Sequence, residues 1–301
     1  MKPLWLIAGA GGMLGRHLTG QLAGQRVVPL DRHALDITDQ EAVDRAIAYH
    51  RPRIVVNAAA WTAADAAEAH RDRAWEVNVA GVRHLARACR RQGALLLHVS
   101  SDYVFPGTAR TPYPEDAPTG PCNTYGRTKA AAEREVLELL PGTGYVVRTA
   151  WVYGVAGRNF VNTMIGLERT QETVDVVDDQ CGQPTWAQDL AGILIRLGDG
   201  AHSGSAPPGI YHGTNRGETT WHGLSREVFR LLGADPSRVL PVTSAELALP
   251  AVRPAYSALG HDRWAAAGIT PLRHWRSALH TAFPALLGAH AQGRERESAE
   301  R

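Results

Sequence analysis

A tyrosine and a lysine four residues apart, Tyr125 and Lys129, could together carry out proton-transfer chemistry. In a helix, residues at this spacing lie on one face, about one turn apart. The lysine ammonium can stabilise a phenolate, so we expect it to lower the pKa of Tyr125 by ~3 units from the free value of about 10. A phenol tuned in this way can donate a proton to a carbonyl oxygen or accept one from an alcohol.

The alternative is a surface helix on which a tyrosine and a lysine meet by accident. The chain has eight tyrosines, but its only lysines are Lys2 and Lys129. About 0.05 such pairs are therefore expected by chance. Arginine, the common cation of this chain, is a wide planar fork, whereas lysine is a compact donor. A lysine at this position therefore favours a chemical role.

A glycine-rich turn near the N-terminus predicts a dinucleotide-binding site. Leu4 to Ala8 has the pattern of a short buried strand, and a helix is expected from Met13 to about Leu22. Glycines between such elements permit a tight turn, a close approach to a pyrophosphate and close helix packing, and the helix N-terminus offers N–H groups to phosphates. We expect cofactor contacts from Gly9, Gly11, Gly12, Met13, Leu14 and Gly15.

The residues after the second strand, Arg26 to Leu30, bear on the choice of cofactor. Asp31 suits a ribose 2′-hydroxyl, whereas Arg32 suits a 2′-phosphate. We favour NADPH, because Arg32 can also lie flat against adenine, and NADH is the alternative. A solvated charge pair at a strand end would explain the same two residues. Asp36 and Ile37 are further expected cofactor contacts.

Short apolar strands and helices alternate over the first 150 residues. A third strand, residues 53–57, is followed by Ala58, Ala59 and Ala60, which permit a flat ligand to approach or only close packing. A long helix to about Gln92, a fourth strand over 94–99 and a fifth over 145–151 follow. This alternation predicts the α/β class, with a doubly wound parallel Rossmann sheet over residues 1–153. We expect residues 154–290 to form a smaller C-terminal α/β substrate lobe, interleaved with returns to the first domain, and residues 291–301 to be a flexible tail.

Polar and aromatic side chains follow the fourth and fifth strands. Ligands of open α/β sheets bind at the carboxyl ends of strands, so Ser101 is placed to hydrogen-bond a substrate carbonyl beside Tyr125. A serine at a strand end is also a common turn former. Trp151 and Tyr153 would face the same cleft, where an aromatic ring could stack on a base or wall off a sugar, or they would fill the core.

Composition excludes several classes of protein. The net charge of +2 is spread along the chain, which argues against nucleic acid as the main partner. The three cysteines are far apart and odd in number, which indicates a reducing cytoplasm. No apolar run is long enough to span a membrane, and the N-terminus does not have the pattern of a signal peptide. The thirteen histidines have no metal-ligand spacing, so we expect no catalytic metal.

Taken together, these residues resemble an extended short-chain dehydrogenase/reductase and, more narrowly, the dTDP-4-dehydrorhamnose reductase family of deoxysugar biosynthesis. The resemblance covers most of the chain, with several motifs in the right order. It rests on Gly9, Gly12 and Gly15; residues 57–60; residues 101–105; Asn123, Tyr125, Gly126 and Lys129; residues 148–154; Asn159 and Phe160; Asp179, Gln180, Gly182, Pro184 and Thr185; residues 189–191; and Arg253, Pro254, Ser257 and Leu259.

The resemblance implies transfer of a hydride from NADPH or NADH to C4 of a dTDP-4-keto-6-deoxyhexose. In that reaction Tyr125 would supply the proton, Lys129 would tune Tyr125 and hold the nicotinamide ribose, and Ser101 would orient the carbonyl. The resemblance also implies substrate contacts from Thr62, Asp65, Ser101, Asp102, Tyr103, Asn123, Trp151 and Arg253. A homodimer is compatible with the sequence, which does not fix the oligomeric state.

Some positions depart from the family pattern. Trp61 stands where a histidine is common, Ser101 where threonine is common, and Tyr256 where asparagine is common. Trp61 and Tyr256 leave the identity of the sugar open. The acidic residues that bind magnesium in some members are absent from the matching places. Two alternatives remain, a nucleotide-sugar epimerase or dehydratase and a non-catalytic regulatory subunit that binds NADP. Dehydratases carry Asp-Glu where this chain has Asp102 and Tyr103, and an intact Ser101, Tyr125 and Lys129 favour an enzyme.

Overall fold

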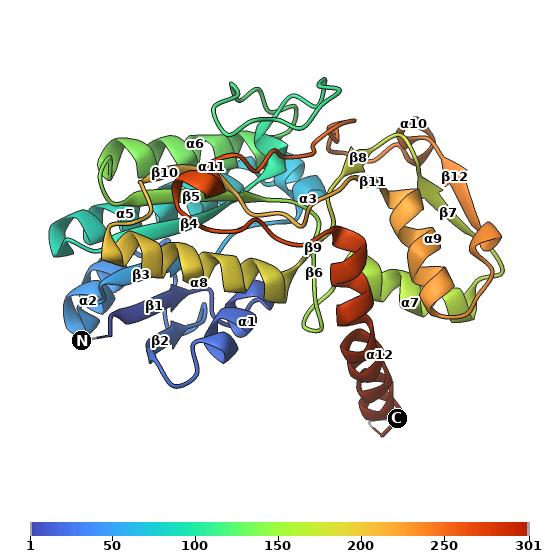
Figure 1. Ribbon diagram of the computed structural model, residues 1–301, viewed down its shortest axis with the longest axis horizontal. Helices are drawn as coiled ribbons and strands as arrows, with labels where there is room; N and C mark the ends of the chain where they lie inside the picture. The colour runs from blue at the N-terminus through green and yellow to red at the C-terminus, as the bar shows by residue number, and fades with distance from the viewer. Residues whose placement is uncertain (1, 300–301) are drawn as a thin grey trace.

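A parallel sheet of six strands forms the centre of the protein (Figure 1). The computed structural model describes residues 2–299, with side chains as far as residue 291. The strand order is β10-β5-β4-β3-β1-β2, and every pair is parallel. These strands are β1 Leu4–Ala8, β2 Arg26–Leu30, β3 Ile54–Asn57, β4 Leu95–Ser101, β5 Gly144–Thr149 and β10 Gly209–His212. The expected α/β class and doubly wound sheet are confirmed.

Helices cover both faces of the sheet, because successive side chains of a strand point to opposite faces. Trp5 and Ile7 pack into one core beneath α1 Met13–Gln21 and α8 Ala187–Ser203. The opposite core lies beneath α2 Gln40–His50, α5 Gly81–Gln92 and α6 Thr124–Leu139, and contains Leu6 and Ala8. Gly198 lets α8 lie close to the sheet, since a β-carbon there would be 2.2 Å from the Trp5 indole.

The segment between β3 and β4 differs from the single long helix that the sequence predicts. It consists of α3 Ala64–Ala69, α4 Arg71–Trp75, a π-helical turn η1 Glu76–Ala80 and then α5. The backbone of His70, with φ −125° and ψ 53°, breaks the helix between α3 and α4. Gly93 ends α5 in the left-handed region, at φ 67°, as expected. The break gives α3 a direction of its own, toward the start of α6.

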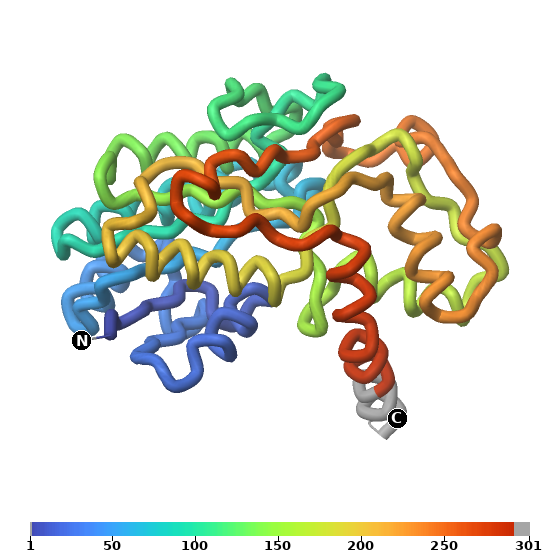
Figure 2. The backbone as a smooth tube through the Cα atoms, viewed as in Figure 1, coloured from blue at the N-terminus to red at the C-terminus, as the bar shows by residue number. Residues whose placement is uncertain are grey.

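The second lobe has its own core and lies at one end of the molecule (Figures 1 and 2). Its main elements are α7 Phe160–Thr170, β7 Val174–Val177, α9 Trp221–Leu231, β12 Val239–Val242, α10 Ser244–Leu247 and α12 Trp275–Ala299. Two short strand pairs join the lobes: β6 Val152–Tyr153 with β9 Thr185–Trp186, and β8 Cys181–Gly182 with β11 Thr219–Thr220. The chain returns to the sheet domain through α8, β10 and α11 Arg263–Ala266.

The C-terminal segment is helical over most of its length. The backbone over residues 291–299, expected to be part of a flexible tail, continues α12. Most residues of this segment are good helix formers (alanine, arginine, glutamate and glutamine), and the weaker ones are the Gly at position 293 and the Ser at position 298. The last two residues of that expected tail lie outside the described part of the chain. Within the described part, no helix has the length and apolar character that a membrane span requires.

Candidate active site

The glycine turn brings the start of α1 against the end of β3. Gly9 has φ +82°, and a β-carbon there would lie 2.6 Å from Ala59 N. A β-carbon at Gly15 would lie 2.3 Å from Gly9 O. These two glycines, with Ala59, therefore serve the close packing of β1, β3 and α1, and they do not line the described cavities.

The N-terminus of α1 provides a site for an anion. Gly12 is its N-cap and supplies no side-chain hydrogen bond, so the first-turn N–H groups have no partner from a capping side chain. Gly12, Met13 and Leu14 all line the same cavity. Unpaired N–H groups at the positive end of a helix dipole fit a pyrophosphate.

Two cavities are lined by neighbouring residues of the glycine turn. The first, of about 620 Å³, lies between the turn and the ends of β4 and β5. The second, of about 580 Å³, is more open and is lined by Gly11 and Asp31 together with Arg16, Pro29 and Ala34. A long dinucleotide can extend through both with its pyrophosphate at α1, so the residues present fit such a cofactor.

The first cavity collects most of the residues that the sequence singles out. The predicted residues that line it are Gly12, Met13, Leu14, Ala58, Ala60, Thr62, Ser101, Asp102, Tyr103, Tyr125, Lys129, Trp151 and Arg253. They come from the start of α1, the loop after β3, the end of β4 and the turn that follows it, α6 and the turn after β5, and Arg253 comes from the C-terminal lobe. The three proposed catalytic side chains therefore face one space with the glycine turn.

Ser101 and Tyr125 line the same part of this cavity. Ser101 is the last residue of β4, two residues beyond the predicted strand end, and its hydroxyl lies near enough to the Tyr125 phenol to lower its pKa. The Ser101 Oγ also donates to Asp102 Oδ1 at 3.0 Å and accepts from Tyr103 N at 3.2 Å. The ring of Tyr103 meets that of Tyr125 edge-on, with 5.7 Å between centroids. The phenol is thereby held at the carboxyl end of β4.

Lys129 lies one turn further along α6 and is fully buried. Its Nζ donates to Val99 O at 2.7 Å and lies 3.3 Å from His98 Nε2. Burial lowers the pKa of Lys129 to about 8, and the negative charge of Glu133 opposes this shift. Burial also holds the pKa of His98 well below its ordinary value, with the Lys129 charge adding to the effect.

The prediction that Lys129 lowers the pKa of Tyr125 is wrong. Burial raises the pKa of Tyr125 to about 12; the hydrogen bond with Ser101 opposes this and the charge of Asp102 adds to it. The Lys129 ammonium is directed to the β4 backbone instead of to the phenol. Desolvation therefore outweighs the ion pair that the spacing suggests, and Tyr125 is a protonated phenol at neutral pH.

Asp102 is a buried carboxyl beside the proposed catalytic group. Its Oδ2 accepts from Ser257 Oγ at 2.6 Å, so the C-terminal lobe contacts the end of β4 directly. Burial raises the pKa of Asp102 to about 6, against the hydrogen bonds from Ser257 and Ser101. Above that pH the carboxylate fixes the orientation of the Ser101 hydroxyl.

Other predicted site residues are used differently. Asn123 caps α6, with its Oδ1 accepting from Gly126 N at 2.7 Å and its Nδ2 donating to Val252 O at 2.8 Å. Asp65 pairs with Arg253 through two contacts of 2.6 and 2.5 Å. Neither Asn123 nor Asp65 is among the residues that line the first cavity.

The predicted residues after β2 also lie apart from the cavities, except for Asp31. Arg32 is largely exposed and lies 4.0 Å from Asp36, whose carboxylate accepts from Thr38 N at 3.0 Å. Ile37 is buried in the core beneath α2 and α5. Hydrogen bonds to Asp31 from the backbone of Ala34 and His33 keep its pKa low.

The residues of the first cavity that sequence reasoning missed include two with large side chains, Arg158 and Trp221. The Trp221 ring stacks on Trp151 with centroids 3.6 Å apart. Trp151 itself has φ +45°, a strained conformation for a large side chain, which persists here because stacking and the close contact with Gly182 hold it. Trp221 begins α9, seventy positions beyond Trp151, so no local pattern connects the two.

The parallel sheet, the glycine turn and the Ser101, Tyr125 and Lys129 group together define a short-chain dehydrogenase/reductase. A family model described as RmlD substrate binding domain matches residues 2–287. The chain belongs to this family.

Individual relatives agree with this assignment. The chain is 61% identical over 289 residues to a dTDP-4-dehydrorhamnose reductase of Streptomyces griseus, with 95% of each chain covered. It is 53% identical over 288 residues to a dTDP-4-keto-6-deoxy-D-glucose reductase of Streptomyces niveus, covering 95% of this chain and 98% of the relative. Its fold is similar to that of a crystal structure of dTDP-4-dehydrorhamnose reductase from Bacillus anthracis in complex with NADP, with a TM-score of 0.89, 36% identity, and 94% and 99% of the two chains covered.

Proposed function

We propose that the protein reduces the C4 ketone of a dTDP-4-keto-6-deoxyhexose with NADPH, as an oxidoreductase of deoxysugar biosynthesis. The observation that carries this proposal is the placement of Tyr125 beside Ser101 in the cavity that is also lined by Lys129 and the start of α1. The names of the relatives support the substrate class, and the NADP in the similar crystal structure supports the cofactor.

NADPH, bound by the glycine turn, supplies the hydride to C4. Tyr125 Oη then gives its proton to the developing alkoxide oxygen, which suits a phenol that is fully protonated at neutral pH. Ser101 Oγ hydrogen-bonds the same oxygen and orients the carbonyl. The Lys129 ammonium, one turn away, stabilises the phenolate that remains.

The substrate is an anion, and the first cavity contains cations that can bind it. Arg253 lines the cavity and is half buried, with Asp65 as its partner. Arg158 enters the same cavity from the loop before α7. We infer that these two guanidinium groups bind the diphosphate, while Trp151 and Trp221 form an apolar wall for the sugar.

The cofactor, the location and the assembly are tested separately from the chemistry. We infer a preference for NADPH over NADH, which a comparison of kcat/KM for the two reductants measures. A cytoplasmic location and a homodimer stay predictions from the sequence. Light scattering of the purified protein measures the oligomeric state directly.

The test of the reaction is NADPH oxidation with a panel of dTDP-4-keto-6-deoxyhexoses, with products identified by NMR. Tyr125→Phe is expected to lower kcat by ~10²–10⁴, the scale of a lost general acid, with little change in NADPH affinity. Tyr49→Phe is the matched control, because Tyr49 is 83% exposed on α2. Unchanged turnover in Tyr125→Phe would disprove the role of this phenol, and no turnover by the wild type on any substrate would disprove the proposed reaction.

A further inference from the structure

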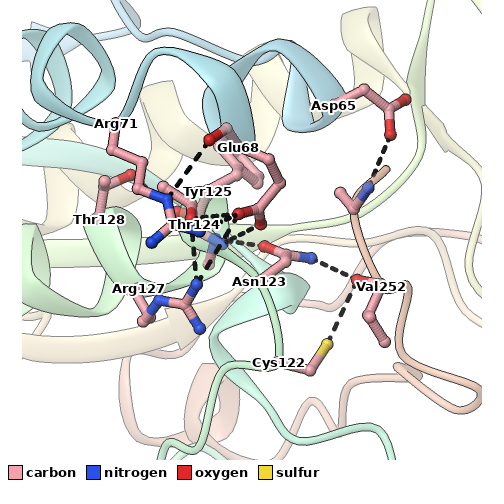
Figure 3. A network of polar contacts seen from close by, with 12 residues as sticks. Asp65, Glu68, Arg71, Cys122, Asn123, Thr124, Tyr125, Arg127, Thr128 and Val252 are labelled. Carbon is pink, nitrogen blue, oxygen red and sulfur yellow. Dashed lines mark hydrogen bonds and ion pairs between the residues drawn. The ribbon is translucent and has the colours of Figure 1, made fainter. Parts of the chain in front are cut away.

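The helix that carries Tyr125 is held at its first turn by a carboxylate from another element (Figure 3). Glu68 lies on α3, and its Oε1 accepts from Thr124 N at 2.7 Å. Its Oε2 accepts from the hydroxyl of the same threonine at 2.6 Å. One side chain thus binds both donors of the residue that immediately precedes Tyr125.

The residue on the other side of Tyr125 is fixed as well. Asn123 Oδ1 accepts from Gly126 N at 2.7 Å, which is an ordinary N-cap contact. A β-carbon at Gly126 would lie 2.1 Å from Tyr103 O, so α6 begins in close contact with the turn that follows β4. Tyr125 therefore lies between two anchored neighbours, one of which is held by Glu68.

The charges around Glu68 favour this arrangement. A carboxylate at a helix N-terminus is stabilised by the helix dipole. Arg71 lies 3.4 Å and Arg127 4.0 Å from Glu68 Oε2, so the carboxylate also separates two cations near the start of α6. The hydrogen bonds from Thr124 are the main reason that the pKa of Glu68 is lowered.

The same short helix also contacts the C-terminal lobe. Asp65, one turn before Glu68 on α3, accepts from Ala251 N at 3.0 Å and pairs with Arg253. On the other side of the same region, Asn123 Nδ2 donates to Val252 O (Figure 3). α3 therefore connects the loop that brings Arg253 into the cavity with the helix that brings Tyr125 into it.

We propose that Glu68 is a positioning residue for the reaction, which fixes the first turn of α6 and thereby the place of the Tyr125 hydroxyl beside Ser101. This inference rests on the proposed function. Glu68 does not line the cavity and makes no contact with the glycine turn, so its effect is on the proton donor and not on cofactor binding. A displacement of about 1 Å at a reacting group can lower a rate by ~10²-fold.

The experiment compares Glu68→Ala and Glu68→Gln with the wild type in steady-state NADPH oxidation. In Glu68→Ala we expect kcat to fall by about 10- to 100-fold, with KM for NADPH within about twofold. Glu68→Gln can still accept from Thr124 N and can donate to the threonine hydroxyl, so it is expected to recover most of kcat. Asp235→Asn is the control, because Asp235 likewise accepts from the N–H and hydroxyl of one residue, Ser237, on the exposed turn η3 Pro236–Arg238.

Each outcome decides the matter. A folded Glu68→Ala with wild-type kcat overturns the inference, and so does a parallel loss of kcat and NADPH affinity that Glu68→Gln does not recover. Should Glu68→Ala not fold, Thr124→Val replaces it. This variant removes the hydroxyl contacts with Glu68 and Arg127 and keeps the hydrogen bond from Thr124 N to Glu68. A lower kcat at constant KM for NADPH supports the inference, and unchanged kcat refutes it.

Hydrogen exchange separates this inference from the proposed function. Amides over residues 124–127 are expected to exchange about 5- to 10-fold faster in Glu68→Ala than in the wild type, the scale of a lost helix cap. This measurement does not depend on turnover. If the wild type does not turn over, only the proposed reaction is refuted. If amide exchange over residues 124–127 is unchanged in Glu68→Ala, the inference that Glu68 fixes the first turn of α6 is refuted.

Discussion

The fall of kcat/KM at alkaline pH is expected to follow the deprotonation of Lys129 and not that of Tyr125. The structure gives pKa values of about 8 for Lys129 and about 12 for Tyr125. A lowered lysine pKa means that the ammonium is present below about pH 8 and is lost above it. In the proposed reaction that charge stabilises the phenolate formed by proton transfer, so the rate should fall as Lys129 becomes neutral.

Deprotonation of Lys129 and deprotonation of Tyr125 would lower kcat/KM at pH 9 by very different amounts. At pH 9, one unit above its pKa, about a tenth of Lys129 is still charged, so kcat/KM should fall about tenfold. At the same pH the loss of protonated Tyr125, three units below its pKa, is only about 0.1%. The groups that face Lys129 do not interfere: His98 is neutral throughout, and Glu133 stays paired with Arg148.

The assay is kcat/KM for NADPH, which reports the free enzyme, measured from pH 7 to pH 10 at constant ionic strength. The lower limit keeps Asp102, with its pKa of about 6, ionised. Return of each sample to pH 7 checks that activity is recovered. Lys129→Arg, which stays charged to pH 10, is expected to be slower but to lack the bend near pH 8. A profile flat to pH 10 in the wild type, or a bend that persists in Lys129→Arg, would refute the reasoning.

Two further predictions concern stability and cofactor binding. Glu133→Ala should lower the free energy of unfolding, measured in urea, by ~3–5 kcal/mol, because it leaves buried Arg148 without its ion-pair partner. The double variant Glu133→Leu with Arg148→Met should recover most of that loss. A loss under about 1 kcal/mol in the single variant would contradict this. Gly15→Ala should weaken NADPH binding at least about tenfold in a fluorescence titration, because its β-carbon would lie 2.3 Å from Gly9 O. Gly20→Ala, on the same helix, is the control. A β-carbon at Gly20 would have nothing within 4 Å, so this variant should bind NADPH normally and gain ~0.5–1 kcal/mol of stability. Equal affinities in these two variants would show that Gly15 does not shape the site.

Residues whose roles depend on local spacing could be predicted from the sequence. The glycines of residues 9–15 follow a short apolar strand, and Tyr125 and Lys129 are separated by one helical turn, so both patterns are set by backbone periodicity. Ser101 was predicted for the same reason, since it follows a strand whose carboxyl end must face the ligand. The sequence alone thus determined the fold class and placed these three side chains in one cavity.

Partners far apart in the chain could not be predicted in this way. Glu68 and Thr124 are 56 positions apart, and Asp65 and Arg253 are 188 apart, so only the packing of α3 against α6 and the C-terminal lobe brings them together. The same holds for the contact of Asn123 with Val252, 129 positions away, which only tertiary packing reveals.

The protonation of the site was decided by tertiary structure for a related reason. Spacing places an ammonium near a phenol, but the pKa of each depends on how much water the surrounding elements exclude. Here β4, α6 and the C-terminal lobe bury both groups, and desolvation raises the pKa of Tyr125 and lowers that of Lys129. The sequence determined which groups meet, and the packing around them determined which of the two carries its charge at neutral pH.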